Sequence, residues 1–441
     1  MITLIKNVNI LTMNQNFDVI ENGEVVIEDD TIVAVGHHCS HNYQLDQVID
    51  GNNGILMPGM INGHSHLGMI PFRGLGDDCV DRLRRFLFPL EIECMDKELV
   101  YHSSRYAMAE MLLAGITTFV DMYYFEDEVA RAGDEMNMRG FVGETIVNFP
   151  SCDSPSEYGG LDYCRWFIPK WKNHPLLVPF VAPHATNTND LEHLKQAHQL
   201  AVEYDVPFSL HVSEMDYEMD YFKKEYQMTP VEFLNHYQMM DEHLLAAHCI
   251  NLNQHDIQLF KQNNSAIVHC LVANLKAAKG AMPLKEVLEQ DVPVALGTDG
   301  PSSGNTLELF TLMKMIACVH KTKNHDRSLF PARDIVALAT IKGAKALRID
   351  HLVGSIEVGK KADITILETQ SANMYPLHDF YSAIVYSANA SNVDTVFVNG
   401  KCLVLNKQLQ QVSLSTLREN LKRASKTFNQ TALEYADKKL D

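Results

Sequence analysis

The chain has 441 residues, 46% of them hydrophobic and 21% charged, a balance typical of a folded protein with one large domain or two. Its 56 acidic residues outnumber 37 basic ones, which gives a formal net charge of -19, and no lysine and arginine run could follow a phosphate backbone. Nucleic acid and anionic membrane surfaces are therefore excluded as expected partners.

The N-terminal stretch Met1–Met13 lacks the cleavage site of a signal peptide, and no apolar window is long enough to span a membrane. The nine cysteines are odd in number, and none are spaced as Cys-x-x-Cys, which argues against a disulfide framework or a thiolate zinc knuckle. We therefore expect a cytoplasmic protein.

The chain begins with a pattern of short strands and turns, which predicts a small β unit over residues 1–56. Turns are expected at Asn22-Gly23 and at Asp29-Asp30, because these dipeptides favour tight turns. The strands are expected at Ile2–Ile5, Glu24–Ile27 and Thr31–Val35.

From residue 57 to residue 350, apolar runs alternate with helical patterns, which predicts βα units and a parallel sheet. Leu191, Leu194, Ala197 and Ala201 show the helical spacing of three and four, and Asn189 or Asp190 is expected to cap that helix. Eight strands close a barrel, so the predicted fold is α/β, a (β/α)₈ TIM-type barrel. The expected strands are Met60–His66, Thr117–Asp121, Gly140–Glu144, Leu177–His184, Pro207–Glu214, Leu244–Ile250, Ala266–Leu271 and Val292–Asp299.

Residues 351–441 return to alternating strands and turns before a terminal helix. Strands are expected at Ala362–Leu367, Thr395–Val398 and Cys402–Val404, with a tight turn at Asn399-Gly400. The two β-rich ends are expected to pack together as one small β-sandwich domain built from both termini.

Each of the eight predicted barrel strands carries an ionisable residue at or near its carboxyl end. Barrel enzymes carry their active sites where the strands exit at the carboxyl edge. Any one such residue could simply mark the start of a loop, but five of the eight ends carry histidine, which is the commonest metal ligand. The pattern therefore predicts a polar site at this edge.

His64 and His66 are the sharpest element, because alternate residues of a strand point to the same side. A lone His-x-His pattern is weak, but His211 and Asp299 add a third nitrogen and a carboxylate. Asp299 could instead cap the helix that follows it. Together the four residues suit one divalent metal ion, Zn²⁺ with Fe²⁺ as the alternative, that leaves a position for water.

Other strand ends provide candidate catalytic groups. Glu214 follows His211 by three residues and is a candidate general acid or base, and Asp299 could also accept a proton from water. His248 is a candidate to orient that water, with a structural core histidine as the alternative. His184 and His269 are candidate substrate contacts, and for His269 a purely structural role is the alternative.

The motifs PGMINGHSH, HVSE, AHC and GTDG together resemble the metal-dependent amidohydrolase superfamily, in particular its methylthioadenosine/S-adenosylhomocysteine deaminases. The resemblance covers almost the whole chain, including GSIEVGKKADITIL and VDTVFVNGK. It implies that His64, His66, His211 and Asp299 are metal ligands and that Glu214 and His248 are catalytic.

The same resemblance implies that His184 contacts substrate, that Glu91 in FLFPLE holds ribose hydroxyls, and that the enzyme is a homo-oligomer. The fourth strand ends in a histidine rather than a lysine that could bridge two metals, so a single ion is implied. Two stretches depart from the pattern. One is HCLVANLK, and the other is RGFVGETIVNF, which after its first residue has no arginine to meet an amino-acid carboxylate. Both departures concern the tail of the substrate.

The resulting hypothesis is a hydrolytic deaminase that releases ammonia from an amino-substituted purine or purine nucleoside, a small-molecule heterocyclic substrate. On the same barrel, the alternatives are deamination of guanine or a pterin, and displacement of a halide from a triazine. A protein that binds metal without catalysis is the alternative from a different class.

Overall fold

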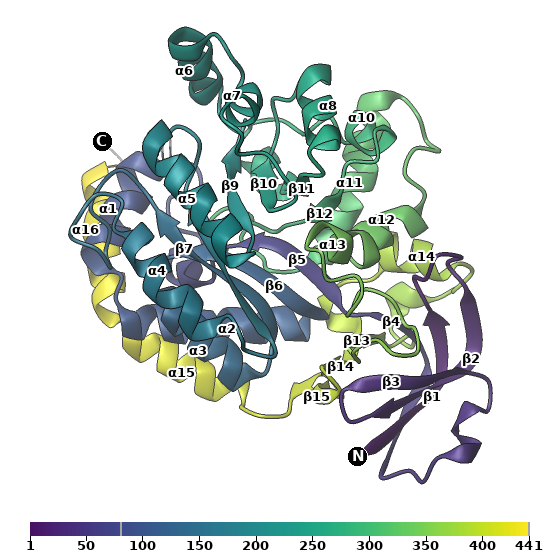
Figure 1. Cartoon of the computed structure of the whole chain (residues 1–441). Coiled ribbons are helices and arrows are strands. Elements are labelled where there is room, and N and C mark those ends of the chain that lie inside the picture. Colours follow the sequence, from purple (N-terminus) through teal and green to yellow (C-terminus); the bar gives the residue numbers. More distant parts are fainter. Residues whose placement is uncertain (80–81, 440–441) are drawn as a thin grey trace.

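The structure is a computed structural model, and it describes residues 1–79 and 82–439. Its centre is a sheet of eight parallel strands whose order in space follows their order in the chain (Figure 1). All eight predicted barrel strands are present, each within a few residues of its expected limits. They are β5 (Met60–Ser65), β6 (Ile116–Tyr123), β7 (Arg139–Ile146), β8 (Leu177–Pro183), β9 (Phe208–Val212), β10 (Leu244–His248), β11 (Ala266–His269) and β12 (Val294–Leu296).

The first and last strands of this sheet meet, which closes the barrel. The backbone N–H of Asp299 donates to the carbonyl of His64 at 3.0 Å, and the Asn62 side chain bonds both the backbone and the hydroxyl of Thr298. Gly63 makes this approach possible, because a Cβ there would lie 2.9 Å from the Cβ of Ala295. Closure therefore brings the end of β5 beside the segment that follows β12.

Helices follow the strands and cover the outside of the barrel (Figure 1). In α5, Leu194, Ala197 and Ala201 are buried, and the Asp190 carboxylate caps the helix by accepting from the N–H of His193 at 2.9 Å, as the pattern predicted. The helices are α1 (Phe88–Cys94), α2 (Lys97–Leu113), α3 (Glu126–Met136), α4 (Gly160–Trp171), α5 (Leu191–Tyr204), α6 (Asp216–Tyr226), α7 (Pro230–His236), α8 (Gln254–Gln262), α9 (Leu271–Lys276), α10 (Leu284–Glu289), α11 (Leu309–Asn324), α12 (Ala332–Leu338), α13 (Ile341–Ala346), α14 (Phe380–Ser382), α15 (Leu414–Ala424) and α16 (Lys426–Lys439).

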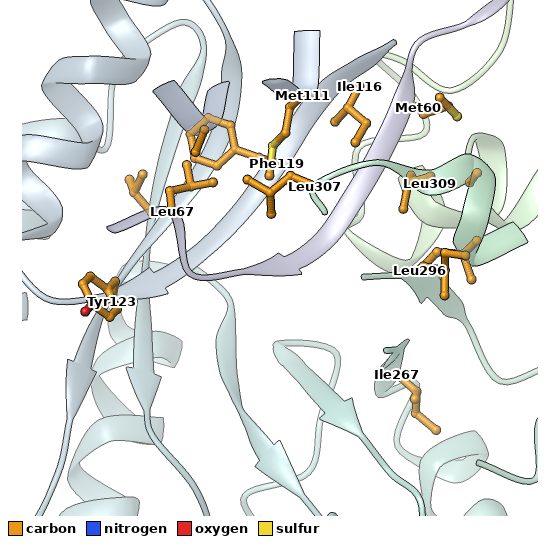
Figure 2. Packing of buried hydrophobic residues seen from close by; sticks show 14 of the residues in the cluster. Met60, Leu67, Met111, Ile116, Phe119, Tyr123, Ile267, Leu296, Leu307 and Leu309 are labelled. Atoms are coloured by element: carbon orange, nitrogen blue, oxygen red, sulfur yellow. The ribbon is translucent and has the colours of Figure 1, made fainter. Parts of the chain in front are cut away.

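The interface between barrel and helices is a large apolar core. Met111 of α2, Phe119 of β6 and Leu67 belong to one buried cluster, part of which is shown in Figure 2. Phe119 is fully buried, which contributes about 2 to 3 kcal/mol relative to an exposed ring. The C-terminal helices extend this core, since Phe428 of α16 meets Phe72 with ring centroids 4.6 Å apart.

Both ends of the chain build the second sheet, as predicted. Its order is β16-β15-β14-β13-β4-β1-β2-β3, and the two ends join where β13 pairs antiparallel with β4. Ile5, Leu56, Ile364 and Phe397 are buried in its own core. The strands are β1 (Ile2–Leu11), β2 (Val19–Glu28), β3 (Thr31–Gly36), β4 (Gln47–Pro58), β13 (Ile364–Leu367), β14 (Val393–Val398), β15 (Lys401–Leu405) and β16 (Gln408–Leu409).

One predicted turn in this sheet is wrong. Asn22-Gly23 lies inside β2, where Asn22 has a φ of 51° and the pairing with β1 shifts register. The dipeptide thus forms a bulge in a continuous strand rather than ending one. The turns at Asp29-Asp30 and Asn399-Gly400 do join neighbouring strands, and Asn399 and Gly400 have φ values of 49° and 76°, as a tight hairpin turn requires.

A buried ion pair fastens the second sheet to the amino-terminal side of the barrel. Arg139, at the start of β7, donates to both carboxylate oxygens of Asp363, at 2.8 and 3.0 Å. Gly59, between β4 and β5, also donates its N–H to the carbonyl of Asp363 at 2.9 Å.

Within the described residues, no helix is both long and apolar enough to cross a membrane.

Candidate metal centre and active site

Histidines from two strands converge at the carboxyl edge of the barrel. The ring centroids of His64 and His66 lie 4.8 Å apart, and those of His64 and His211 lie 4.9 Å apart. His64 and His66 come from the end of β5 and His211 from β9, so the barrel itself brings together residues distant in the sequence. This is the arrangement that the alternation of β5 predicted.

Two of these imidazoles are oriented by backbone carbonyls. His66 Nδ1 contacts the carbonyl of Met122, and His211 Nδ1 contacts the carbonyl of His184. A carbonyl only accepts hydrogen bonds, so each Nδ1 carries a proton, and each Nε2 is the ring atom that could bind a metal. Metal-binding histidines are typically held in this way, with the ligand nitrogen directed inward.

His64 shows the clearest need for a ligand. Its side chain is buried, and its Nε2 has no hydrogen-bond partner among the described residues. An unpaired buried nitrogen costs about 1 to 3 kcal/mol. Burial, together with the neighbouring His66 and His211, holds the pKa of His64 well below its usual value, so the ring is neutral and able to bind a cation.

Asp299 completes the set from the segment after β12. Its Oδ1 lies 3.2 Å from His66 Nε2 and accepts the N–H of Gly300 at 2.6 Å. Burial is the largest single effect and opposes charge on both groups, but their hydrogen bond and mutual attraction, with smaller contributions from neighbours, together outweigh it. The pKa of Asp299 therefore falls well below its usual value, and that of His66 rises to about 9. Without a cation, a proton therefore occupies the space between these two ligand atoms.

The donor atoms form two groups compact enough to hold one cation, and His64 belongs to both. In the described part of the chain these groups are His64, His66 and Asp299, and His64, His211 and His248, each with ligand atoms within 4.8 Å of one another. Neutral imidazoles with one carboxylate suit a borderline divalent ion. These residues therefore fit one divalent metal centred near His64 Nε2.

His248 and Glu214 lie next to this centre. Asn274 Oδ1 accepts from His248 Nδ1 at 2.8 Å, and His248 Nε2 lies 3.7 Å from Glu214 Oε1. Lys279 also contacts Glu214 Oε1, at 2.5 Å. Burial would raise the pKa of Glu214, but His248 and Lys279 lower it to about 2, so this carboxylate is ionised at neutral pH.

A pocket of about 240 Å³ is lined by His66, His211 and Asp299 of the candidate metal ligands. Both His248 and Asp299 leave their strands in the left-handed conformation, with φ values of 70° and 60°, a strain of about 1 to 3 kcal/mol each that is typical of functional sites. The pocket lining includes His66, Glu91, Tyr123, His184, His211, Glu214, His248, Lys279 and Asp299.

Glu91 and His184, two of the predicted substrate contacts, line this pocket from different elements. Glu91 lies on α1, only 5% exposed, and its burial raises the pKa to about 7 although Tyr123 opposes the shift. His184 follows β8, and burial and the nearby His66 lower its pKa to about 4. The pocket wall thus offers a carboxyl that is partly protonated near neutral pH and a neutral imidazole.

Comparison with known proteins identifies the family. A family model described as the amidohydrolase family matches residues 55–403. The chain belongs to the amidohydrolase family. A 5-methylthioadenosine/S-adenosylhomocysteine deaminase 1 from Syntrophus aciditrophicus is 35% identical over 98% of this amidohydrolase and 98% of the relative. A 5'-deoxyadenosine deaminase from Methanosphaera stadtmanae is 35% identical over 93% of this chain and 95% of the relative.

A solved structure supports the same placement. An adenosine deaminase from Xanthomonas campestris with bound zinc superimposes with a TM-score of 0.93, covering 97% of this amidohydrolase and 98% of that chain, at 27% identity. The predicted barrel with an added sheet is therefore confirmed by a full-length structural neighbour.

His269 lies outside the pocket of this amidohydrolase. Its Nε2 faces His320 Nε2 of α11 at 3.1 Å, and the ring is completely buried. It is absent from the pocket lining. The geometry therefore favours the structural alternative for His269 over the expected substrate contact. Asp121 and Glu144 likewise end strands without lining the pocket.

Three residues of the site were missed by sequence reasoning: Lys279, Glu218 and Asn274. Glu218 Oε2 accepts the backbone N–H of Glu214 at 2.8 Å, and Asn274 orients His248. Glu218 and Asn274 lie in helices, where a polar residue is ordinarily a solvated one. Lys279 follows closely after HCLVANLK, the stretch that departs from the family pattern. That departure was the signal in the sequence that could have drawn attention to Lys279.

Proposed function

We propose that this amidohydrolase is a metal-dependent hydrolytic deaminase that acts on an amino-substituted purine nucleoside and releases ammonia. Relatives covering nearly the whole chain carry the names of methylthioadenosine/S-adenosylhomocysteine and 5'-deoxyadenosine deaminases. The observation that carries the proposal is that His66, His211 and Asp299 line one pocket with Glu214 and His248, and that the buried His64 belongs to both candidate metal-binding groups behind it.

His64, His66, His211 and Asp299 would hold one ion, for which we propose Zn²⁺. Three imidazoles and a carboxylate suit zinc, and a zinc-bound adenosine deaminase shares the fold. Such an ion supplies Lewis acidity that makes water nucleophilic at neutral pH. The fully neutral His64 and His211, both with lowered pKa values, are ready to bind it without losing protons.

Hydrolytic deamination replaces the amino group by the oxygen of water, and the two protons of that water must be moved. Both Asp299 and Glu214 begin as carboxylates, since their pKa values lie below neutrality. Each can therefore accept one proton. Glu214 passes its proton to a ring nitrogen, which makes the amino-bearing carbon electrophilic, and Asp299 passes the other to the departing amine.

His248 Nε2 lies 3.7 Å from Glu214 Oε1, and Asn274 holds the opposite ring nitrogen, so we propose that His248 orients the attacking water by a hydrogen bond. Glu91 and His184 face the pocket from α1 and the end of β8. We propose that Glu91 binds the ribose hydroxyls and that His184 contacts the base. A buried carboxyl favours substrates with a hydroxyl donor, because without one the carboxyl stays unpaired in the pocket, which costs binding free energy.

The test is ammonia release by the zinc-loaded protein across a panel of substrates. The panel contains methylthioadenosine, S-adenosylhomocysteine, 5'-deoxyadenosine, adenosine, guanine, a pterin and a chlorinated triazine. We expect release from the adenosine-type nucleosides. Release from guanine or the pterin alone, or chloride from the triazine alone, would reassign the substrate, and stoichiometric metal with no turnover of any compound would indicate a protein that only binds metal.

Three further expectations remain predictions. The cytoplasmic location, the homo-oligomeric state and the domain limits at residues 56 and 350 come from the sequence. In the structure, β4 continues to Pro58 and β13 begins at Ile364. Limited proteolysis of the purified protein would locate the limits, and light scattering would give its oligomeric state.

A further inference from the structure

Lys279 enters the pocket although no step of the proposed reaction uses it. Its Nζ donates to Glu214 Oε1 at 2.5 Å, and the two side chains are only 26% and 14% exposed. Taking an ammonium and a carboxylate out of water is costly, and a pair of apolar residues is often as stable. The pair therefore calls for a reason other than stability.

The chain around Lys279 is shaped to direct it into the pocket. Ala278 and Gly280, on either side of it, have φ values of +55° and +109°, which is left-handed backbone that turns the chain sharply after α9. The N–H of Lys279 is fixed by the carbonyl of Asn274 at 2.9 Å. The side chain of the same asparagine holds His248, so one residue sets both groups that lie next to Glu214 Oε1.

Every polar atom of Glu214 except its side-chain Oε2 has a neighbouring polar group within the described residues. Its backbone N–H donates to Glu218 Oε2 at 2.8 Å, and its carbonyl accepts from Asn251 Nδ2 at 3.4 Å. Its Oε1 is engaged by Lys279 and lies near His248. Among the described residues nothing bonds Oε2, which leaves that oxygen for a ligand in the pocket.

We propose that Lys279 is a positioning residue for the deamination step, holding Oε1 of Glu214 so that Oε2 meets the ring nitrogen of the substrate. This inference rests on the proposed function. Positioned proton transfer is sensitive to displacement, because the donor must lie within hydrogen-bond reach of the atom it protonates. The lowered pKa of Glu214 agrees with a carboxylate that is ionised before substrate arrives.

The first experiment removes the ammonium and keeps the length of the side chain. We expect Lys279→Met to lower kcat by about 10- to 100-fold while KM changes less than about threefold. Lys279→Arg retains a cationic donor and should recover most of the loss. Lys285→Met is the matched control, because it breaks the ion pair with Glu289 at 2.8 Å on α10, outside the pocket lining, and should keep wild-type activity.

The second experiment asks whether Lys279 acts through Glu214. In the Glu214→Gln background, measured at high enzyme concentration, adding Lys279→Met should cost less than about twofold more, since the positioned group is already lost. If the activity losses of the two single variants instead multiply in the double variant, Lys279 contacts the substrate itself, and the positioning role is overturned. A main effect on KM in the single variant would overturn it as well.

Zinc content and the melting temperature identify a variant that fails to fold. If Lys279→Met does not fold, Lys279→Gln takes its place, and activity equal to that of Lys279→Arg would refute the need for a cation. A wild-type protein that releases no ammonia from any aminopurine refutes the proposed function, and the Lys279 role falls with it. Wild-type turnover together with a fully active Lys279→Met protein refutes the Lys279 role alone.

Discussion

Glu91 provides a sharp test because its proposed role in binding conflicts with stability. In the metal-free protein, burial raises the pKa of Glu91 from its ordinary value of 4.5 to about 7. Between these values the folded chain keeps a proton that the unfolded chain releases, so stability falls as pH rises. Glu91→Gln removes the titrating group and should remove that loss.

The size of the effect follows from the two pKa values. At about 1.4 kcal/mol per pH unit, the cost of Glu91 is below about 1 kcal/mol at pH 5 and about 3 kcal/mol at pH 8. Urea unfolding of chelator-treated protein at both pH values measures it. We expect the stability of Glu91→Gln relative to wild type to increase by about 2.5 kcal/mol from pH 5 to pH 8.

The same substitution should weaken substrate binding. Loss of the carboxylate is expected to raise KM for ribose-bearing substrates about fivefold, for about 1 kcal/mol of hydrogen bonding. Glu203→Gln, on the exposed side of α5, is the control and should change neither quantity. A Glu91→Gln protein with the same pH dependence of stability as wild type would refute the account of a buried, partly protonated carboxyl.

Three further substitutions test separate parts of the structure. Glu214→Gln should retain zinc and fold but lose about 10²- to 10⁴-fold in ammonia release, and an active variant would remove its role in proton transfer. Asn274→Ala should lower kcat by about 10- to 100-fold with zinc retained, because His248 loses the partner that orients it, and unchanged kcat would show that His248 needs no support. Arg139→Met should destabilise the protein by about 3 to 5 kcal/mol in urea unfolding, since it leaves a buried carboxylate unpaired. The exposed pair of Arg165 is the control, and equal effects of Arg165→Met and Arg139→Met would show that burial does not matter.

The barrel strands and the convergence of the candidate metal ligands were predictable because two local rules coincide in them. Each strand is an apolar run, and alternation places His64 and His66 on one side. Closure of the barrel then brings in His211 on β9, and the backbone hydrogen bond from Asp299 to His64 places Asp299 beside them. The rule fails for His269, because a strand end shows only that a polar group is near the edge, and here the ring turns toward His320 on α11.

The conformation of the loops could not be predicted from the sequence. Lys279 reaches the pocket through left-handed backbone at Ala278 and Gly280, which local patterns do not reveal. The strand β4 was missed for a related reason. Its Asn52 and Asn53 resemble a turn, but they form a bulge that the neighbouring β1 accommodates with a shift in register.

One cation is expected to bind where His64, His66, His211 and Asp299 meet. Anomalous diffraction at the zinc edge, from crystals of the zinc-loaded protein, locates that cation. We expect one strong peak per chain, about 2.0 to 2.2 Å from a nitrogen of each histidine and from an Asp299 oxygen. A peak elsewhere, or one that His64 does not ligate, would contradict it.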